Sequence, residues 1–172
     1  MFISFMNNAL KNAELSLLNN EVPVGAVLVK NNNIIAEARN CMSLLKNPIK
    51  HAEILLVENE IIKIKSKYLN KYDIYVTLQP CDMCLYALRL IRIRRIYFGA
   101  YTNSSLQSNI TKLNLIKNDN KNKKYIKNDN IDTKNLSKNS NKIEIYGGIM
   151  EDKCSNILKK FFKQKRNINI KY

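Results

Sequence analysis

The sequence has 172 residues, of which 45% are hydrophobic, and it carries a formal net charge of +15. A chain of this length and apolar content can bury roughly 70% of its unfolded surface in one domain, so it does not depend on disulfide crosslinks. The charge suggests a polyanionic partner, but 23 of the 29 basic residues are Lys that accompany 26 Asn along the chain, so a solvated Lys-rich surface is the simpler explanation.

Residues 1–18 predict an amphipathic helix rather than a signal peptide. Their apolar residues recur every three to four positions and do not form an unbroken apolar core: Phe2, Phe5, Met6, Ala9, Ala13 and Leu17. The most apolar run elsewhere is interrupted by arginines from Arg89 to Arg95, short of the roughly 18 residues that cross a bilayer. We therefore expect a cytoplasmic protein that does not span a membrane.

Strand and helix patterns alternate through the rest of the chain, which predicts an α/β fold. Asparagines between the first two strands predict a hairpin turn, and Pro48 and Pro80 each precede a helical pattern. The predicted strands are 25–30, 33–39, 72–78, 94–100 and 142–147, and the later helices are predicted to begin at Ala52, Cys81 and about Met150.

Two of the predicted helices begin with residues that can bind a metal. His51, the only histidine, lies at the start of one helix, and Cys81 and Cys84 lie three apart on one face of the other. In a reducing compartment a Cys-x-x-Cys pair indicates a metal or a redox site, and only the metal site needs a further ligand. Each helix follows a strand or a loop beside one, so their starts can be brought side by side at one edge of a shared sheet, where the three side chains would converge on Zn²⁺.

Three protein ligands leave the fourth tetrahedral position of zinc for water, whose pKa zinc lowers to about 7. Glu53 follows His51 by two residues, where a carboxylate can move a proton between that water and a leaving group. Without the metal ligands, Glu53 would be an ordinary helix-start carboxylate. Cys41 and Cys154 lack paired spacing and are interpreted as packing residues. The pattern therefore favours hydrolytic deamination.

At these residues the chain resembles a known family. The sequences HAE at 51–53 and PCDMC at 80–84 fit the H-x-E and P-C-x-x-C signature of zinc deaminases that act on bases. The surrounding strings are similar to those of the bacterial tRNA-specific adenosine deaminases: EVPVGAVLV, VTLQPCDMC, RIYFGA and GGIMEDKCSNILKKFFKQKR. The resemblance covers about residues 3–100 and 143–166.

The resemblance implies one domain, 1–172, folded as a three-layer α/β/α cytidine-deaminase-like sandwich with a central mixed five-stranded sheet. It also implies a homodimer with one Zn²⁺ per subunit, which binds the tRNA anticodon stem-loop and converts the wobble adenosine of an arginine tRNA with an ACG anticodon to inosine. The implied zinc ligands are His51, Cys81 and Cys84, and Glu53 is the implied proton shuttle. The implied substrate-binding residues are Asn40, Val22, Ala52 and Pro80, and the implied RNA-binding residues are Phe161, Phe162, Lys163 and Arg166.

The chain departs from the family in three places. Gln79 stands where the family usually has Glu before Pro-Cys, and we expect this change to have modest effects. After FGA the family typically continues with an acidic residue and a glycine-containing loop that approaches the RNA, whereas this chain has YTNSS at 101–105, which predicts a weaker contact with RNA there. Residues 101–142 exceed the family's usual connection by roughly twenty residues and contain 11 Asn, 9 Lys and 3 Asp, which predicts a flexible insertion. The insertion could attract tRNA or be a tolerated expansion, because added loop length costs little free energy.

The residues are also compatible with two other classes of function. A zinc deaminase of a free nucleoside or base would share the metal chemistry and turn over small molecules. A catalytically silent RNA-binding subunit would bind tRNA without forming inosine, but it would not need Glu53.

Overall fold

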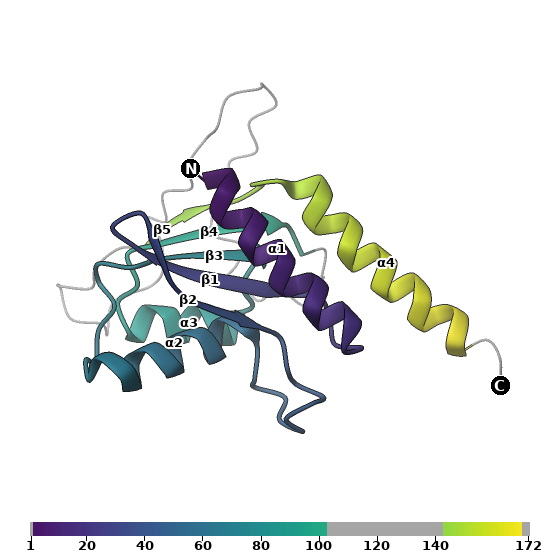
Figure 1. Cartoon of the computed structure of the whole chain (residues 1–172), viewed down its shortest axis with the longest axis horizontal. Coiled ribbons are helices and arrows are strands. Elements are labelled where there is room, and N and C mark those ends of the chain that lie inside the picture. Colours follow the sequence, from purple (N-terminus) through teal and green to yellow (C-terminus); the bar gives the residue numbers. More distant parts are fainter. Residues whose placement is uncertain (1, 103–142, 170–172) are drawn as a thin grey trace.

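The computed structural model describes residues 2–102 and 143–169, and in it a five-stranded sheet lies between two layers of helices (Figure 1). Helices α2 and α3 cover one face, and α1 and α4 cover the other. This is the predicted three-layer arrangement. The elements are α1 Phe2–Leu18, β1 Gly25–Lys30, β2 Asn33–Arg39, α2 Ala52–Ile64, β3 Asp73–Leu78, α3 Asp82–Leu90, β4 Arg95–Ala100, β5 Glu144–Tyr146 and α4 Glu151–Asn169.

The sheet is mixed, with the strand order β2-β1-β3-β4-β5. Strand β1 pairs antiparallel with both β2 and β3, whereas β4 is parallel to β3 and to β5. The predicted hairpin is confirmed, and both residues of its turn have positive φ angles, 50° at Asn31 and 62° at Asn32. Asparagine tolerates this left-handed conformation, which matches the twist of a two-residue hairpin.

Each face of the sheet contributes to a separate hydrophobic cluster because successive side chains of a strand point to opposite sides. In β1, Ala26 and Leu28 pack toward α2 and α3, while Val27 and Val29 pack toward α1. The parallel strand β3 continues into α3, and the hairpin strand β2 continues through a loop into α2. The starts of α2 and α3 are thereby brought to the same face of the sheet.

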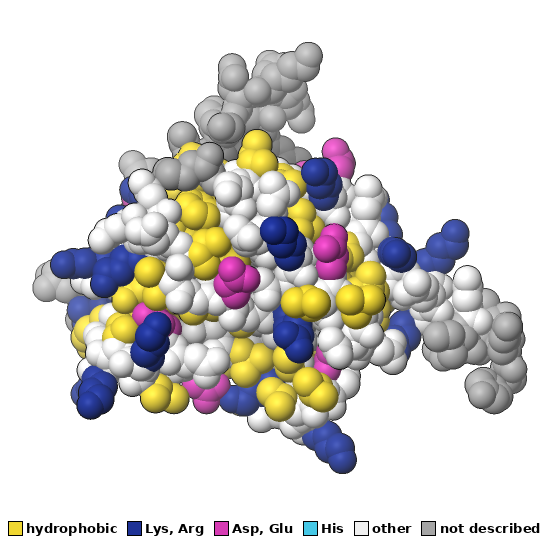
Figure 2. All heavy atoms as spheres, in the orientation of Figure 1, with side chains coloured by type: hydrophobic (Ala, Val, Ile, Leu, Met, Phe, Trp, Pro, Cys, Tyr) yellow, Lys and Arg dark blue, Asp and Glu magenta, His cyan; other side chains and the backbone are white. Residues whose placement is uncertain are grey.

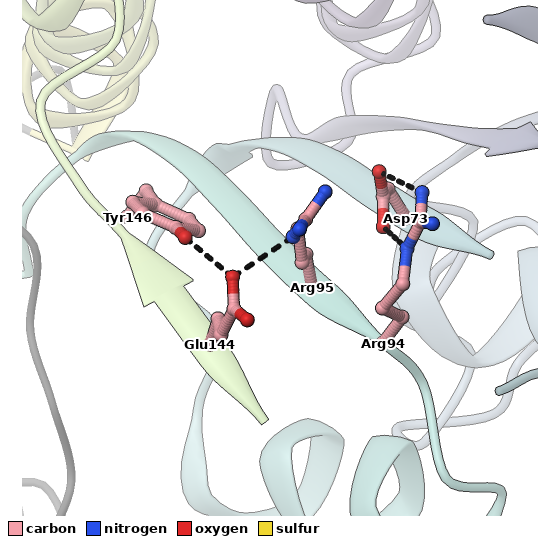
Figure 3. Close-up of polar contacts among 5 residues, drawn as sticks. All are labelled: Asp73, Arg94, Arg95, Glu144 and Tyr146. Carbon is pink, nitrogen blue, oxygen red and sulfur yellow. Dashed lines mark hydrogen bonds and ion pairs between the residues drawn. The ribbon is translucent and has the colours of Figure 1, made fainter. Parts of the chain in front are cut away.

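The edge strand β5 is only three residues long, and polar and aromatic contacts hold it against β4 (Figure 3). Glu144 accepts hydrogen bonds from Arg95 and from the hydroxyl of Tyr146. The ring of Tyr146 stacks on that of Tyr97 with the centroids 4.8 Å apart. Tyr97 in turn stacks on Tyr75 of β3 at 4.5 Å, so the rings form a ladder across three strands.

Most of the predicted insertion lies at 103–142, outside the described residues. The predicted last strand is shorter than expected, since only 144–146 pair with β4. Among the described residues, none of the helices is long and apolar enough to cross a bilayer.

Candidate metal centre and active site

His51 lies where the loop after β2 ends and α2 begins. It is the N-cap residue of α2, with an extended backbone (φ −69°, ψ 156°), and its carbonyl accepts a hydrogen bond from the N–H of Leu55 at 3.0 Å. The imidazole makes no capping hydrogen bond with the helix. The ring is therefore left for another partner.

The cysteine pair has the same relationship to α3. Cys81 is the N-cap residue, also with an extended backbone (φ −71°, ψ 169°), and its carbonyl accepts a hydrogen bond from the N–H of Leu85 at 2.9 Å. Pro80 precedes it and has no N–H to place in the loop. Cys84 lies one turn further along and is fully buried, while Cys81 is exposed.

The structure brings these three side chains together. The Nδ1 atom of His51 lies 3.6 Å from the Sγ of Cys81 and 3.4 Å from the Sγ of Cys84. Tetrahedral zinc with typical Zn–N and Zn–S bonds separates such atoms by about 3.5 Å, so the donor set fits Zn²⁺. No other group of three such ligands occurs in the part of the chain that the structure describes. The three predicted metal ligands are therefore positioned to bind one metal ion, and Cys41 and Cys154 lie outside this group.

Hydrogen bonds and helix dipoles favour a thiolate at this site. The hydrogen bond from Cys84 and, to a smaller extent, that with the His51 ring outweigh burial and lower the pKa of Cys81 to about 4. The same hydrogen bond, together with burial, raises the pKa of Cys84. The hydrogen bond with Cys81 raises the pKa of His51. The N-termini of α2 and α3 add positive partial charge beside the sulfurs.

Glu53 lies in the first turn of α2, and only 4% of its surface is exposed. Burial raises the pKa of its carboxyl from 4.5 to about 6, while its own backbone N–H and a hydrogen bond with Cys84 oppose that rise. The contact with Cys84 means that the carboxyl faces the metal centre. A carboxyl that can both hold and release a proton near neutral pH suits general acid–base chemistry.

Asn40 follows directly after β2, and its side chain is 3% exposed. Its backbone N–H donates a hydrogen bond to the carbonyl of Val24 at 2.9 Å, but its Nδ2 atom has no hydrogen-bond partner among the described residues. A buried donor without a partner is costly, and such groups are concentrated where a protein binds something else. The other predicted pocket residues are half-buried Val22, fully buried Ala52 and buried Pro80.

The predicted RNA-binding residues lie on α4 and differ in exposure. The side chain of Phe161 is 6% exposed and packs inward, whereas that of Phe162 is 49% exposed. Lys163 and Arg166 are exposed beside it. A pocket between the ends of α1 and α4 is lined by Leu17, Asn20, Phe161, Gln164, Lys165 and Asn167.

Sequence reasoning did not single out two buried polar residues at the end of α1, Ser16 and Glu21. The one sequence feature that could have pointed to Glu21 is that it begins the string EVPVGAVLV, one of the strings that resemble the family.

The three-layer fold with a His/Cys/Cys group and an adjacent buried glutamate defines a zinc-dependent deaminase. Residues 3–100 match the family described as the cytidine and deoxycytidylate deaminase zinc-binding region. The chain is 41% identical over 169 residues to a tRNA-specific adenosine deaminase of Buchnera aphidicola subsp. Baizongia pistaciae, covering 98% of this chain and 92% of that one. It belongs to the tRNA-specific adenosine deaminase family.

Two further comparisons agree with this assignment. A tRNA-specific adenosine deaminase of Rickettsia typhi is 35% identical over 166 residues, which cover 94% of this chain and 98% of the relative. A solved structure from a study of tRNA:A34 deaminases, which edit adenosine to inosine at the wobble position, superposes with a TM-score of 0.69. It is 28% identical, and the match covers 90% of this chain and 99% of that one.

Proposed function

We propose that the protein deaminates adenosine to inosine at the wobble position of a tRNA, with the ACG anticodon loop of an arginine tRNA as the first candidate. The observation that carries this proposal is the convergence of His51, Cys81 and Cys84 beside the buried carboxyl of Glu53. The relatives that share the fold over most of the chain are named tRNA-specific adenosine deaminases, which supports tRNA as the substrate.

Glu53 would carry the proton transfers of the reaction. Zinc, when held by His51, Cys81 and Cys84, supplies Lewis-acid activation of the attacking water. The Glu53 carboxylate takes a proton from this water as its oxygen bonds to C6 of adenine, and it delivers that proton to N1 as the C6–N1 double bond opens. It then moves the proton of the new hydroxyl group to the amino group, which leaves as ammonia as the C6–N bond breaks and the C6–O double bond forms. The products are inosine and ammonia.

Asn40, Val22, Ala52 and Pro80 would form the adenine pocket. The amide of Asn40 has a donor and an acceptor, which suits the mixed hydrogen-bonding edge of adenine. Its Nδ2 atom has no partner among the described residues, so a bound base would satisfy it. The three other side chains are apolar and would exclude water from around the ring.

Helix α4 would contact the anticodon loop through Phe162, Lys163 and Arg166. Exposed aromatic rings stack on unpaired bases, and basic side chains contact phosphates. Figure 2 shows Lys and Arg side chains spread over one face of the molecule, with Asp and Glu between them, rather than gathered in one patch. Net charge alone therefore does not define the RNA path. A tRNA substrate would make the cytoplasm the site of action.

The active unit would be a homodimer. On α3, large apolar side chains are exposed at positions i, i+3 and i+7, where they share one helix face: Met83, Tyr86 and Leu90, with 36%, 44% and 74% of their surfaces exposed. Since α3 also carries Cys84, a second copy packed on this face would lie against a helix that holds one of the metal ligands. Light scattering of the native protein and of Leu90→Arg tests this proposal, and we expect a dimer and a monomer respectively.

The activity is tested by incubating the purified protein with an ACG anticodon stem-loop and measuring inosine at the wobble position. We expect inosine with the native chain, and a rate lower by about 10² to 10⁴ with Glu53→Ala at unchanged zinc content. Free adenosine, cytidine and guanine are measured in parallel. Turnover of a free base but not of the stem-loop would support the small-molecule deaminase instead, and tight RNA binding without inosine would support a silent subunit.

A further inference from the structure

The loop at 41–50 joins two residues of the proposed active site. Asn40 precedes it and His51 follows it, so the folding of the loop sets the separation of the base-binding amide and the metal-binding imidazole. The loop closes at its base, where the N–H of Cys41 donates a hydrogen bond to the carbonyl of Lys50 at 3.3 Å. Figure 1 shows the loop extending away from the sheet between β2 and α2.

One buried carboxylate attaches this loop to the rest of the protein. Oε1 of Glu21 accepts a hydrogen bond of 2.7 Å from the backbone N–H of Leu44, in the middle of the loop. Only 2% of the surface of Glu21 is exposed, although Leu44 itself is 63% exposed. A charge-assisted hydrogen bond from a backbone N–H is stronger than a neutral one, and the burial of the Glu21 acceptor limits the access of water to this bond.

The end of α1 holds Glu21 in place. Asn20 has a positive φ angle of 60°, and the N–H groups of Asn20 and Glu21 donate to the carbonyls of Leu17 and Ser16. This is the Schellman pattern that ends a helix, and it fixes the backbone of Glu21 relative to α1. The backbone of Glu21 is therefore fixed by the end of α1, and its carboxylate is a hydrogen-bond acceptor in a defined position.

Ser16 attaches Asn40 to the same helix end. Its hydroxyl is fully buried and lies 3.1 Å from the carbonyl oxygen of Asn40 and 3.4 Å from that of Val24. The backbone N–H of Asn40 also donates to Val24. The backbone of Asn40 is thus held on both sides, and the loop that follows is held by Glu21.

We propose that Glu21 is a positioning residue of the deamination reaction: it holds the 41–50 loop through Leu44 and thereby aims the Asn40 amide at the bound adenine. The Oε2 atom of Glu21 and the Nδ2 atom of Asn40 both lack partners among the described residues. Two buried polar atoms of this kind beside one loop indicate that the region is organised for a ligand rather than for stability alone. This proposal rests on the proposed role of Asn40.

The first test measures steady-state inosine formation on the stem-loop for Glu21→Ala, Glu21→Gln, Asn40→Ala and the double variant. We expect Glu21→Ala to raise KM about tenfold, with kcat changed less than about threefold and zinc content unchanged. Glu21→Gln retains an acceptor oxygen and should restore most of the affinity. Since Glu21 acts through Asn40, the KM of the double variant Glu21→Ala/Asn40→Ala should be close to that of Asn40→Ala alone.

A matched control is Glu37→Ala, at an exposed position of β2, which removes a carboxylate that accepts a hydrogen bond of 2.6 Å from Asn12 of α1. Its KM should equal that of the native chain. The proposal is overturned if Glu21→Ala leaves KM unchanged, if its effect adds fully to that of Asn40→Ala, or if zinc and thermal stability are lost together in both Glu21 variants.

A second test needs no activity. Hydrogen exchange followed by mass spectrometry should show faster exchange across residues 41–50 in Glu21→Ala, and near-native exchange in Glu21→Gln. Unchanged protection of this loop in Glu21→Ala would overturn the proposal even if the native chain formed no inosine. If the native chain forms no inosine but the 41–50 loop still exchanges faster in Glu21→Ala, the result would count against the proposed substrate and not against the role of Glu21.

Discussion

The Nε atom of Arg95 donates a hydrogen bond of 2.8 Å to the Oε2 atom of Glu144, joining residues 49 positions apart in the chain (Figure 3). The two residues are register partners in the β4–β5 ladder, and two residues further along Tyr97 pairs with Tyr146. A three-residue strand has few backbone hydrogen bonds with which to select its register. The ion pair and the ring stack therefore select it together.

We expect the ring stack to contribute more to stability than the ion pair. Arg95 and Glu144 are 36% and 52% exposed, and exposed ion pairs contribute about 0–1 kcal/mol. Stacked aromatic pairs contribute about 0.5–1.5 kcal/mol beyond the area that they bury. In urea titrations, Tyr146→Ala should lower the free energy of unfolding by about 1–3 kcal/mol and Glu144→Gln by less than about 1 kcal/mol. A larger loss with Glu144→Gln would contradict this order.

The same pair gives stability a small pH dependence. The hydrogen bond from Tyr146 and then that from Arg95 lower the pKa of Glu144 below 4.5. A lowered pKa in the folded state means that the stabilisation is present above pH 4.5 and is lost as the pH falls through the folded value. The native chain should therefore be more stable than Glu144→Gln above pH 4.5, and this difference in stability should shrink as the pH falls below 4.5. Parallel thermal melts of the two proteins at several pH values measure the difference.

Local patterns in the sequence were enough to predict the strands, the hairpin and the helices that carry the metal ligands. His51 and Cys81 begin helices whose periodicity is clear, so their place at two helix N-termini followed from the sequence. The contact of Glu21 with Leu44 spans 23 positions, and no periodicity reports it. The paired phenylalanines of the last helix raised the same difficulty, because spacing alone could not say which ring packs inward.

Zinc binding should depend on Cys84 and not on Cys41. Cys84 is buried in the metal group, so Cys84→Ser replaces a thiolate by a weak ligand and should abolish both zinc content and activity. Cys41 is partly exposed and lies outside the group, so Cys41→Ser should retain one zinc per subunit. Elemental analysis of both variants, and of native protein after chelation and readdition of Zn²⁺, measures this. Equal metal loss in both variants would refute the three-residue ligand set.

Gly99 of β4 should be required for the close packing of α4. A Cβ atom at this position would lie 2.3 Å from the Sγ of Cys154 and 2.8 Å from the carbonyl oxygen of Thr77. Gly99→Ala should therefore destabilise the protein by about 1–3 kcal/mol. Adding Cys154→Ala removes the sulfur but leaves a Cβ atom at 2.7 Å, so the double variant should recover only part of the loss. Additive losses in thermal melts would mean that the two residues do not compete for one space.

Gln79 should tolerate the family's usual glutamate. Its Oε1 atom accepts a hydrogen bond of 3.3 Å from the N–H of Thr102, and its own N–H donates to the carbonyl of Ala100 at 2.9 Å. Glutamate keeps the acceptor, so we expect kcat/KM of Gln79→Glu within about threefold of native and a larger loss with Gln79→Ala. Inosine assays of both variants measure this. A rise above tenfold with Gln79→Glu would show that the neutral side chain limits this enzyme.

The two phenylalanines of α4 should separate RNA affinity from stability. Phe161 is 6% exposed, so Phe161→Ala should lower the free energy of unfolding by about 3–5 kcal/mol. Phe162 is 49% exposed, and if it stacks on a base, Phe162→Ala should weaken stem-loop binding by about 1–3 kcal/mol with little change in melting temperature. Binding titrations of Phe162→Ala and Lys163→Ala at several salt concentrations distinguish base stacking from phosphate contacts. Losing a phosphate contact flattens the salt dependence of the affinity, whereas losing a stacking contact leaves its slope unchanged. Unchanged affinity in both Phe162→Ala and Lys163→Ala would exclude this face of α4 from the RNA path.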